Sequence, residues 1–176
     1  MKNTDTLHNE MHQLIYEILN ASFKEADEGF CTEIRITLFP DGSVQIEDNG
    51  RGIPLTGAEH PDHHTLQKIF AGHPVSNIEY SHMETFSNAG LQMVNSLCEK
   101  LQVCVYRDGL FFQQDYVRGI PQHKITSRPA VHPSGTRITL MPDRAIFKDL
   151  RFLRDHIQSW IKEQTVHSRH VEIFLE

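Results

Sequence analysis

The decapeptide QIEDNGRGIP, residues 45–54, carries the pattern that decides the fold. It continues a strand pattern in which Val44, Ile46 and Asp48 share one face. The two aliphatic residues predict that this face is buried, so the Asp48 carboxylate needs a partner, because burying an unpaired charge is costly. Turn residues with two glycines follow at once. The stretch therefore predicts a small-molecule site at the end of a strand.

Composition is ordinary for one soluble domain. The chain has 176 residues, of which 39% are hydrophobic and 23% charged. No apolar run approaches the roughly 20 residues that cross a bilayer, and the N-terminus lacks a secretory segment, so we predict a cytoplasmic protein that does not bind membranes. A net charge of −6 without a Lys/Arg cluster predicts no direct nucleic-acid binding.

Cysteine and histidine patterns are the remaining places to look for a metal. The three cysteines form no CxxC pair, which disfavours a zinc site, and their odd number disfavours a disulfide framework. The loop HPDHH, residues 60–64, is either a metal site or a solvated loop. Neighbouring side chains in a polar loop rarely converge on one ion, so we favour the loop and predict no metal site.

The periodicity of apolar residues predicts an α+β fold. Helical spacing indicates helices over residues 9–26, 65–71, 88–100 and 148–165. Alternation indicates strands over residues 32–39, 43–48, 101–107, 110–117, 136–142 and 170–175. Asp41-Gly42 and Asp108-Gly109 are hairpin turns, and Leu153 is expected to face inward on the last helix. We expect a two-layer α/β sandwich with a mixed, mostly antiparallel sheet, helices on one face and a more polar second face.

Glu17, on the first helix, is either a surface glutamate or a general base that acts on water. Together with EDNGRGIP it resembles the GHKL (Bergerat-fold) ATP-binding family, in particular the N-terminal ATPase domain of gyrase B and its topoisomerase IV counterpart. The similarity includes HQLIYEILNASFKEA (12–26), MVNSLCEKLQVCVYRDG (93–109), QQDYVRGIPQ (113–122) and SGTRITLMPDRAIF (134–147). It implies one domain over residues 1–176, without the family's N-terminal arm, transducer and DNA-gate parts. The initial Met1 favours a complete gene product.

The resemblance implies an adenine pocket. Asp48 would accept a hydrogen bond from the exocyclic amine, and Thr136 would bind the adenine edge and a water beside Asp48. Gly52 would let the backbone lie flat against the base, and Ile53 and Pro54 would form a wall.

The family pattern also implies roles for charged residues. Arg51 would lie over the base, Arg107 would pair with Glu25 at the pocket rim, and Glu17 would be the catalytic residue that polarises the attacking water. Together with the adenine pocket, these residues predict ATP or ADP as the ligand.

One departure from the family concerns magnesium. Family members place an asparagine, the Mg²⁺ ligand, one helical turn after the catalytic glutamate, where this chain has Ala21. Asn20 is rotated about 100° away on a helix. Because Mg²⁺ requires oxygen ligands in near-octahedral geometry, we expect its binding to be weak or lost.

The phosphate loops differ as well. ETFSNAG, residues 84–90, keeps only Gly90 of a glycine-rich run, and in AGHPVSN, residues 71–77, Pro74 stands where the family has a lysine. Backbone N–H groups of glycine loops cradle phosphates. We therefore expect nucleotide binding with weak or lost ATP hydrolysis.

Two alternatives stay open. In the first, the chain is a non-catalytic interaction module that binds gyrase or topoisomerase IV subunits or intercepts pocket-directed inhibitors. In the second, it is a serine kinase of the anti-sigma type. The kinase also needs the magnesium asparagine, and the sequence after Asn95 follows gyrase instead.

Overall fold

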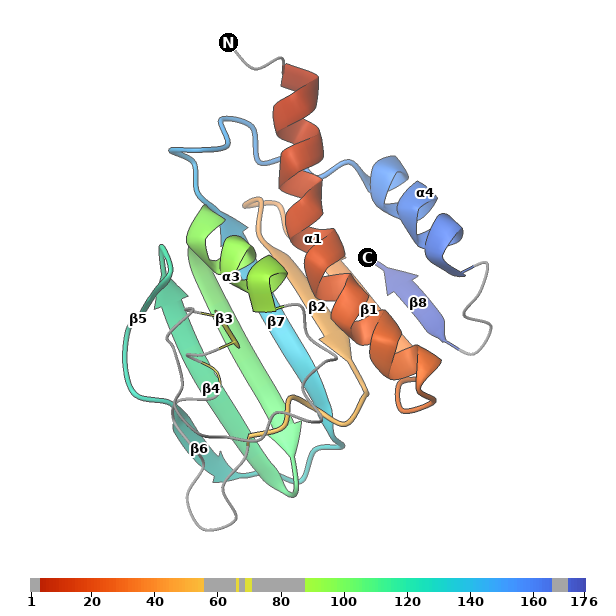
Figure 1. The fold of residues 1–176 in the computed structure, drawn as a ribbon, viewed down its shortest axis with the longest axis vertical. Helices are drawn as coiled ribbons and strands as arrows, with labels where there is room; N and C mark the ends of the chain where they lie inside the picture. The colour runs from red at the N-terminus through yellow and green to blue at the C-terminus, as the bar shows by residue number, and fades with distance from the viewer. Residues whose placement is uncertain (1–3, 56–65, 67–68, 71–87, 166–170) are drawn as a thin grey trace.

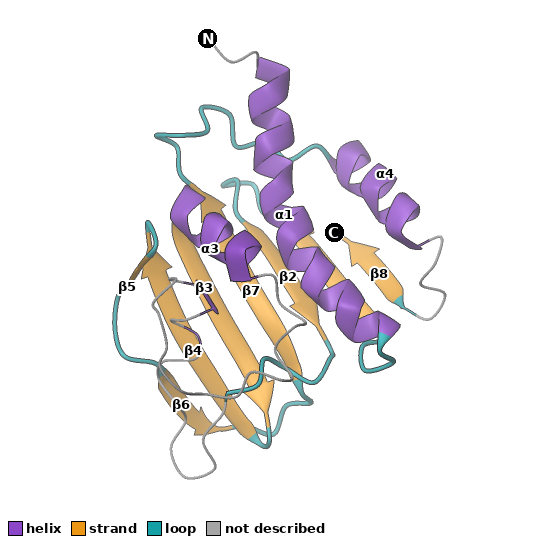
Figure 2. Cartoon of the chain, viewed as in Figure 1, coloured by secondary structure: helices purple, strands orange, loops and turns teal. Residues whose placement is uncertain are grey.

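One mixed sheet with helices against one of its faces makes up the described chain (Figures 1 and 2). The computed structural model describes residues 4–55, 66, 69–70, 88–165 and 171–176, with backbone only at residues 4–9 and 88. Its helices are α1 (Thr4–Asp27), α3 (Asn88–Leu97) and α4 (Arg154–Thr165). Its strands are β1 (Glu33–Leu38), β2 (Val44–Asp48), β3 (Cys98–Arg107), β4 (Leu110–Val117), β5 (Ile120–Pro121), β6 (Thr126–Pro129), β7 (Gly135–Pro142) and β8 (Glu172–Leu175).

The strand order is β5-β4-β3-β7-β2-β1-β8, and β6 also pairs with β4. All pairs are antiparallel except β1 with β8. The predicted hairpin turns are present, with positive φ at Gly42, Asp108 and Gly109. The predicted fold class, an α+β sandwich with a mostly antiparallel sheet, is confirmed.

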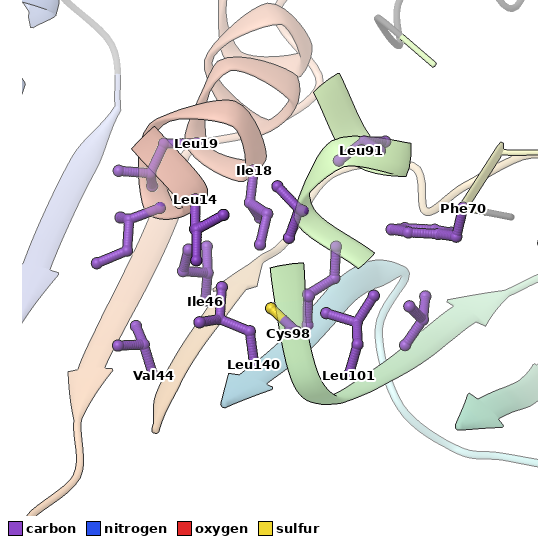
Figure 3. Close-up of a cluster of buried hydrophobic side chains, with 14 of the residues drawn as sticks. Leu14, Ile18, Leu19, Val44, Ile46, Phe70, Leu91, Cys98, Leu101 and Leu140 are labelled. Atoms are coloured by element: carbon purple, nitrogen blue, oxygen red, sulfur yellow. The ribbon is translucent and has the colours of Figure 1, made fainter. Parts of the chain in front are cut away.

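The core lies between the helices and the sheet (Figure 3). Leu14 and Ile18 of α1 point toward Ile46 of β2 and Leu140 of β7, and Leu91 of α3 closes the same layer. All five are at most 2% exposed. This packing holds α1 across the strands that carry Asp48.

The opposite face of the sheet is polar, as expected. Arg137 of β7 forms an ion pair with Glu47 of β2, with 2.9 Å between Nη2 and Oε1. Gln102 of β3 donates a hydrogen bond of 2.9 Å to Asp115 of β4. Cross-strand pairs of this kind stabilise a solvated sheet face.

Three predicted helices have different bounds, and the one predicted over 9–26 extends over Thr4–Asp27. The helix predicted over 88–100 ends at Leu97, because the chain enters β3 at Cys98, which pairs with Pro142 of β7. The helix predicted over 148–165 begins only at Arg154. Before it, His12 of α1 accepts a hydrogen bond from the Leu153 N–H, 2.9 Å, and the Leu153 side chain is 40% exposed rather than inward.

Short elements were harder to predict. The sequence did not predict β5 or β6, which form only through their pairing with β4. Of the helix predicted over 65–71, Leu66, Ile69 and Phe70 are helical and buried, and the rest lies outside the described residues. In the described part of the chain, no helix is long and apolar enough to cross a membrane.

Candidate functional site

Asp48 is the centre of the site, at the C-terminal end of β2. Its Oδ2 accepts a hydrogen bond of 2.9 Å from the Ser22 hydroxyl of α1, and its Oδ1 accepts one of 3.0 Å from the Gly50 N–H. Burial raises the pKa of Asp48, and hydrogen bonds from Ser22, Gly50 and the Thr136 backbone act against that rise. A carboxylate has about four acceptor positions, so Asp48 retains capacity for a further donor.

A cavity lies beside this carboxylate. Its polar lining comes from Ser22, Glu25, Asp48 and Thr136, and its apolar lining from α1, β2, α3 and β7. Between the described residues its volume is about 10 Å³, room for about one water molecule.

Sheet register brings Thr136 to Asp48. The two residues are directly opposite each other in the β2–β7 ladder, and Thr136 is 7% exposed. Both line the cavity. The sequence predicted both residues for one site, and the antiparallel register is the physical reason that they meet.

Gly52 also lines the cavity, and the structure adds a second reason for glycine there. Its φ is +74°, and a Cβ at this position would lie 2.7 Å from the Tyr106 carbonyl oxygen of β3. The loop after β2 thus passes against the sheet backbone at a distance that excludes any side chain.

Glu25 supports the loop after β2 through Arg51. The Arg51 backbone N–H and guanidinium both bond the Glu25 carboxylate, with 2.6 Å from Nη2 to Oε1. The same guanidinium pairs with Glu28 and lies 3.7 Å above the Phe30 ring centre. Burial would raise the pKa of Glu25, but the bonds from Arg51 lower it overall. The predicted position of Arg51 over a base stays a prediction.

We expect Arg51→Met to lower the free energy of unfolding by about 1–2 kcal/mol, because it removes the guanidinium from the buried Glu25 carboxylate and leaves it the Arg51 backbone N–H. Arg151→Met is the control: Arg151 is 83% exposed and pairs only locally with Asp149, so its loss should cost less than about 0.5 kcal/mol. Urea denaturation measures both.

The pH dependence has a defined sign. Folding lowers the pKa of Glu25, so the pair stabilises the fold above the ordinary glutamate pKa and loses that effect as pH falls through the lowered value. The difference in the free energy of unfolding between wild type and Arg51→Met should become smaller at acidic pH. A difference that does not change with pH would contradict a stabilising role of the Arg51–Glu25 pair.

The predicted pair between Arg107 and Glu25 is wrong. Arg107 instead donates a 2.8 Å hydrogen bond to the Gly52 carbonyl and forms an ion pair with Asp108 at 3.4 Å. Arg107 therefore holds the Gly52 turn from the β3 side.

Glu17 and Gly90 meet at the contact between α1 and α3. A Cβ at Gly90 would collide with the Glu17 carboxylate. Ala21 lies one turn further along α1 and lines the cavity, whereas Asn20 is exposed. The structure thus places a methyl group at the position where the resemblance puts the magnesium ligand.

Several predicted site residues are not tested. Ile53 is fully buried in the core and Pro54 is partly buried, so their contact with a ligand stays a prediction. Residues 60–64, 71–77 and 84–87, which are the histidine loop, the AGHPVSN loop and the first four residues of ETFSNAG, lie outside the described residues.

Ser22 is the site residue that the sequence analysis missed. Its side chain is 2% exposed, and its position five residues after Glu17 places it close to the cavity. A serine among buried aliphatics in a helix was the signal that could have found it, since its hydroxyl needs a partner.

The class of protein is defined by a helix packed over a carboxylate at the end of a strand, beside a glycine turn on an α+β sheet. The chain belongs to the family of histidine kinase-, DNA gyrase B- and HSP90-like ATPases, whose model matches residues 6–146.

Within this family the chain is a gyrase-B-like domain. It is 36% identical to DNA gyrase B of Thermotoga maritima over 157 residues, 87% of this chain and 25% of that protein. It is 36% identical to the topoisomerase 4 counterpart of gyrase B from Staphylococcus aureus over 143 residues, 78% of this chain and 21% of that protein. The chain thus spans about a quarter of these relatives.

A solved structure shares the fold. The 43K ATPase domain of Thermus thermophilus gyrase B, crystallised in complex with an aminocoumarin, matches with a TM-score of 0.77 and 30% identity. The match covers 94% of this chain and 42% of that one.

Proposed function

We propose that this gyrase-B-like domain binds adenine nucleotides and hydrolyses ATP weakly or not at all. The observation that carries the proposal is Asp48. Its carboxylate is held by two donors from opposite sides, 2.9 and 3.0 Å away, while it also lines a cavity with Thr136.

The adenine edge fits this arrangement chemically. An ionised carboxylate only accepts hydrogen bonds, and the exocyclic amine of adenine only donates them. The Thr136 hydroxyl both donates and accepts, and it suits the ring nitrogens or a bridging water. The apolar side chains from α1 and α3 match the faces of a planar base.

The described residues do not fit a magnesium ion. Mg²⁺ takes oxygen ligands, and the cavity-facing position one turn after Glu17 is the methyl group of Ala21, while Asn20 faces solvent. We therefore assign no step of a reaction to magnesium in this chain.

Glu17 would act on water as a general base if hydrolysis occurs. Its carboxylate lies against Gly90 in the first turn of α3. General-base catalysis alone contributes about 10²–10⁴-fold, whereas electrostatic stabilisation of the transferred phosphoryl group is usually the larger effect. Weak turnover is the result we propose.

Calorimetric titration with adenosine, ADP and ATP, each with and without Mg²⁺, tests the proposal. We expect all three to bind with affinities within about tenfold of each other, and Mg²⁺ to change each affinity by less than about twofold. Turnover at the rate of an ordinary gyrase would overturn the proposed loss of hydrolysis. The absence of heat with every ligand would overturn nucleotide binding and favour the alternative, a module that binds gyrase or topoisomerase IV subunits or pocket-directed inhibitors.

Ala21→Asn is expected to restore magnesium dependence, because it returns an amide oxygen to the cavity wall. We expect Mg²⁺ to raise the ATP affinity of this variant by about tenfold, and that of adenosine not at all. Asn20→Ala, on the exposed side of α1, is the control and should leave the wild-type response unchanged. A magnesium response in wild type that is lost in Asn20→Ala would assign the ligand to Asn20.

A further inference from the structure

Ser22 makes a contact that is unusual for a serine inside a helix. Such a hydroxyl commonly bonds a carbonyl in the preceding turn of its own helix. Here it crosses from α1 to β2 and donates to Asp48 Oδ2, 2.9 Å away and 26 residues later. Ser22 is 2% exposed, so this is a buried hydrogen bond to a carboxylate.

We infer that Ser22 is a positioning residue for the ligand-binding carboxylate: its hydroxyl favours the charged form of Asp48, holds its carboxylate plane at the cavity, and so extends nucleotide binding to lower pH. The inference rests on the proposed nucleotide site. It adds a residue that controls the pH range of that site.

The geometry explains the effect. Ser22 and Gly50 each occupy one oxygen of Asp48, which fixes the rotation of the carboxylate plane. A proton on Oδ2 would end the bond that Ser22 donates, because the Ser22 hydroxyl would have to turn its hydrogen elsewhere and accept instead. Donors favour the charged form of a carboxylate, and the Ser22 bond is the largest influence that opposes the effect of burial on the pKa of Asp48.

The charged groups near Asp48 do not take over the effect of the Ser22 hydrogen bond on its charged form. The charge of Glu25, on α1, raises the pKa of Asp48, whereas Arg51 and Arg107 lower the pKa of Glu25 itself. Burial raises the pKa of Cys31, in the α1–β1 loop, to about 11, so this thiol is neutral. From β7 the neighbour is Thr136, which carries no charge.

Ser22→Ala tests the inference, with two readouts. The first is the titration midpoint of the Asp48 carboxyl carbon by NMR without ligand, assigned with Asp48→Asn. We expect the midpoint to rise by about one pH unit. The second is adenosine affinity against pH, which should fall about threefold at pH 8 and about tenfold near the midpoint of the variant. Ser96→Ala is the control, because the Ser96 hydroxyl bonds only the Met93 carbonyl on the exposed side of α3.

The outcomes distinguish the role of Ser22 from the proposed nucleotide binding. An unchanged midpoint, or an affinity loss that is equal at every pH, would overturn the role of Ser22. Adenosine binding in neither protein, together with a shifted midpoint, would overturn the proposed function and leave the effect of Ser22 on Asp48 standing. If Ser22→Ala does not fold, Ser22→Cys, of similar size and a weaker donor, should shift the midpoint in the same direction.

Discussion

Asp48→Asn is expected to lower adenosine affinity by about a hundredfold, roughly 2.7 kcal/mol. The variant has nearly the same shape, but it replaces one acceptor oxygen by an NH₂ donor. Ser22 and Gly50 already donate to the two oxygens of Asp48, so the new NH₂ must face one of these donors or the amine of the ligand. An NH₂ that faces the Gly50 N–H or the ligand amine brings two donors together, and one that faces Ser22 forces the hydroxyl to turn its hydrogen away and accept.

Isothermal titration calorimetry with adenosine measures this loss, and Asp41→Asn is the matched control. Asp41 lies in the turn of the same β1–β2 hairpin, where it accepts hydrogen bonds from the Ser43 N–H and hydroxyl at the surface. Its variant should bind as wild type. If Asp48→Asn also bound adenosine normally, Asp48 would not be the adenine acceptor.

Gly52→Ala is expected to lower the free energy of unfolding by about 3 kcal/mol. A φ of +74° costs an alanine about 1 kcal/mol. The added Cβ would lie 2.7 Å from the Tyr106 carbonyl oxygen, and β3 cannot move away without loss of its pairing with β7. Displacing that backbone contributes about 2 kcal/mol more.

Gly29→Ala separates the two contributions. Gly29 has a φ of +83°, but a Cβ there has no heavy atom within 4 Å beyond its chain neighbours. We expect it to cost only about 1 kcal/mol. Urea denaturation of both variants gives the comparison, and equal losses would mean that the contact with Tyr106 contributes nothing.

Local patterns were sufficient for much of the fold. The alternation in residues 43–48 predicted a half-buried strand with Asp48 on the side of Val44 and Ile46, and these two side chains are buried. The Asp41-Gly42 and Asp108-Gly109 pairs predicted hairpins, because positive φ is favourable for few residues. These features depend on neighbours in the chain.

Elements that depend on distant partners were missed or misplaced. The β6 strand, TSRP, has four exposed residues and no alternation, and it forms a strand because β4 offers a free edge. The start of α4 moved to Arg154 because His12 of α1 binds the Leu153 N–H. Neither partner lies close in sequence.

For the site, the strand pattern was sufficient to predict Asp48 as a buried carboxylate at a strand end, and the resemblance to the GHKL family added Gly52 and Thr136 to the same site. Which side chains bond one another was decided only in three dimensions. Glu25 forms its ion pair with Arg51 rather than with Arg107, and Asp48 accepts a hydrogen bond from Ser22. A hydrogen bond needs its donor and acceptor within about 3 Å and in the right direction. Ser22 and Asp48 are 26 residues apart in the chain, so only the packing of α1 on the sheet brings them to this distance.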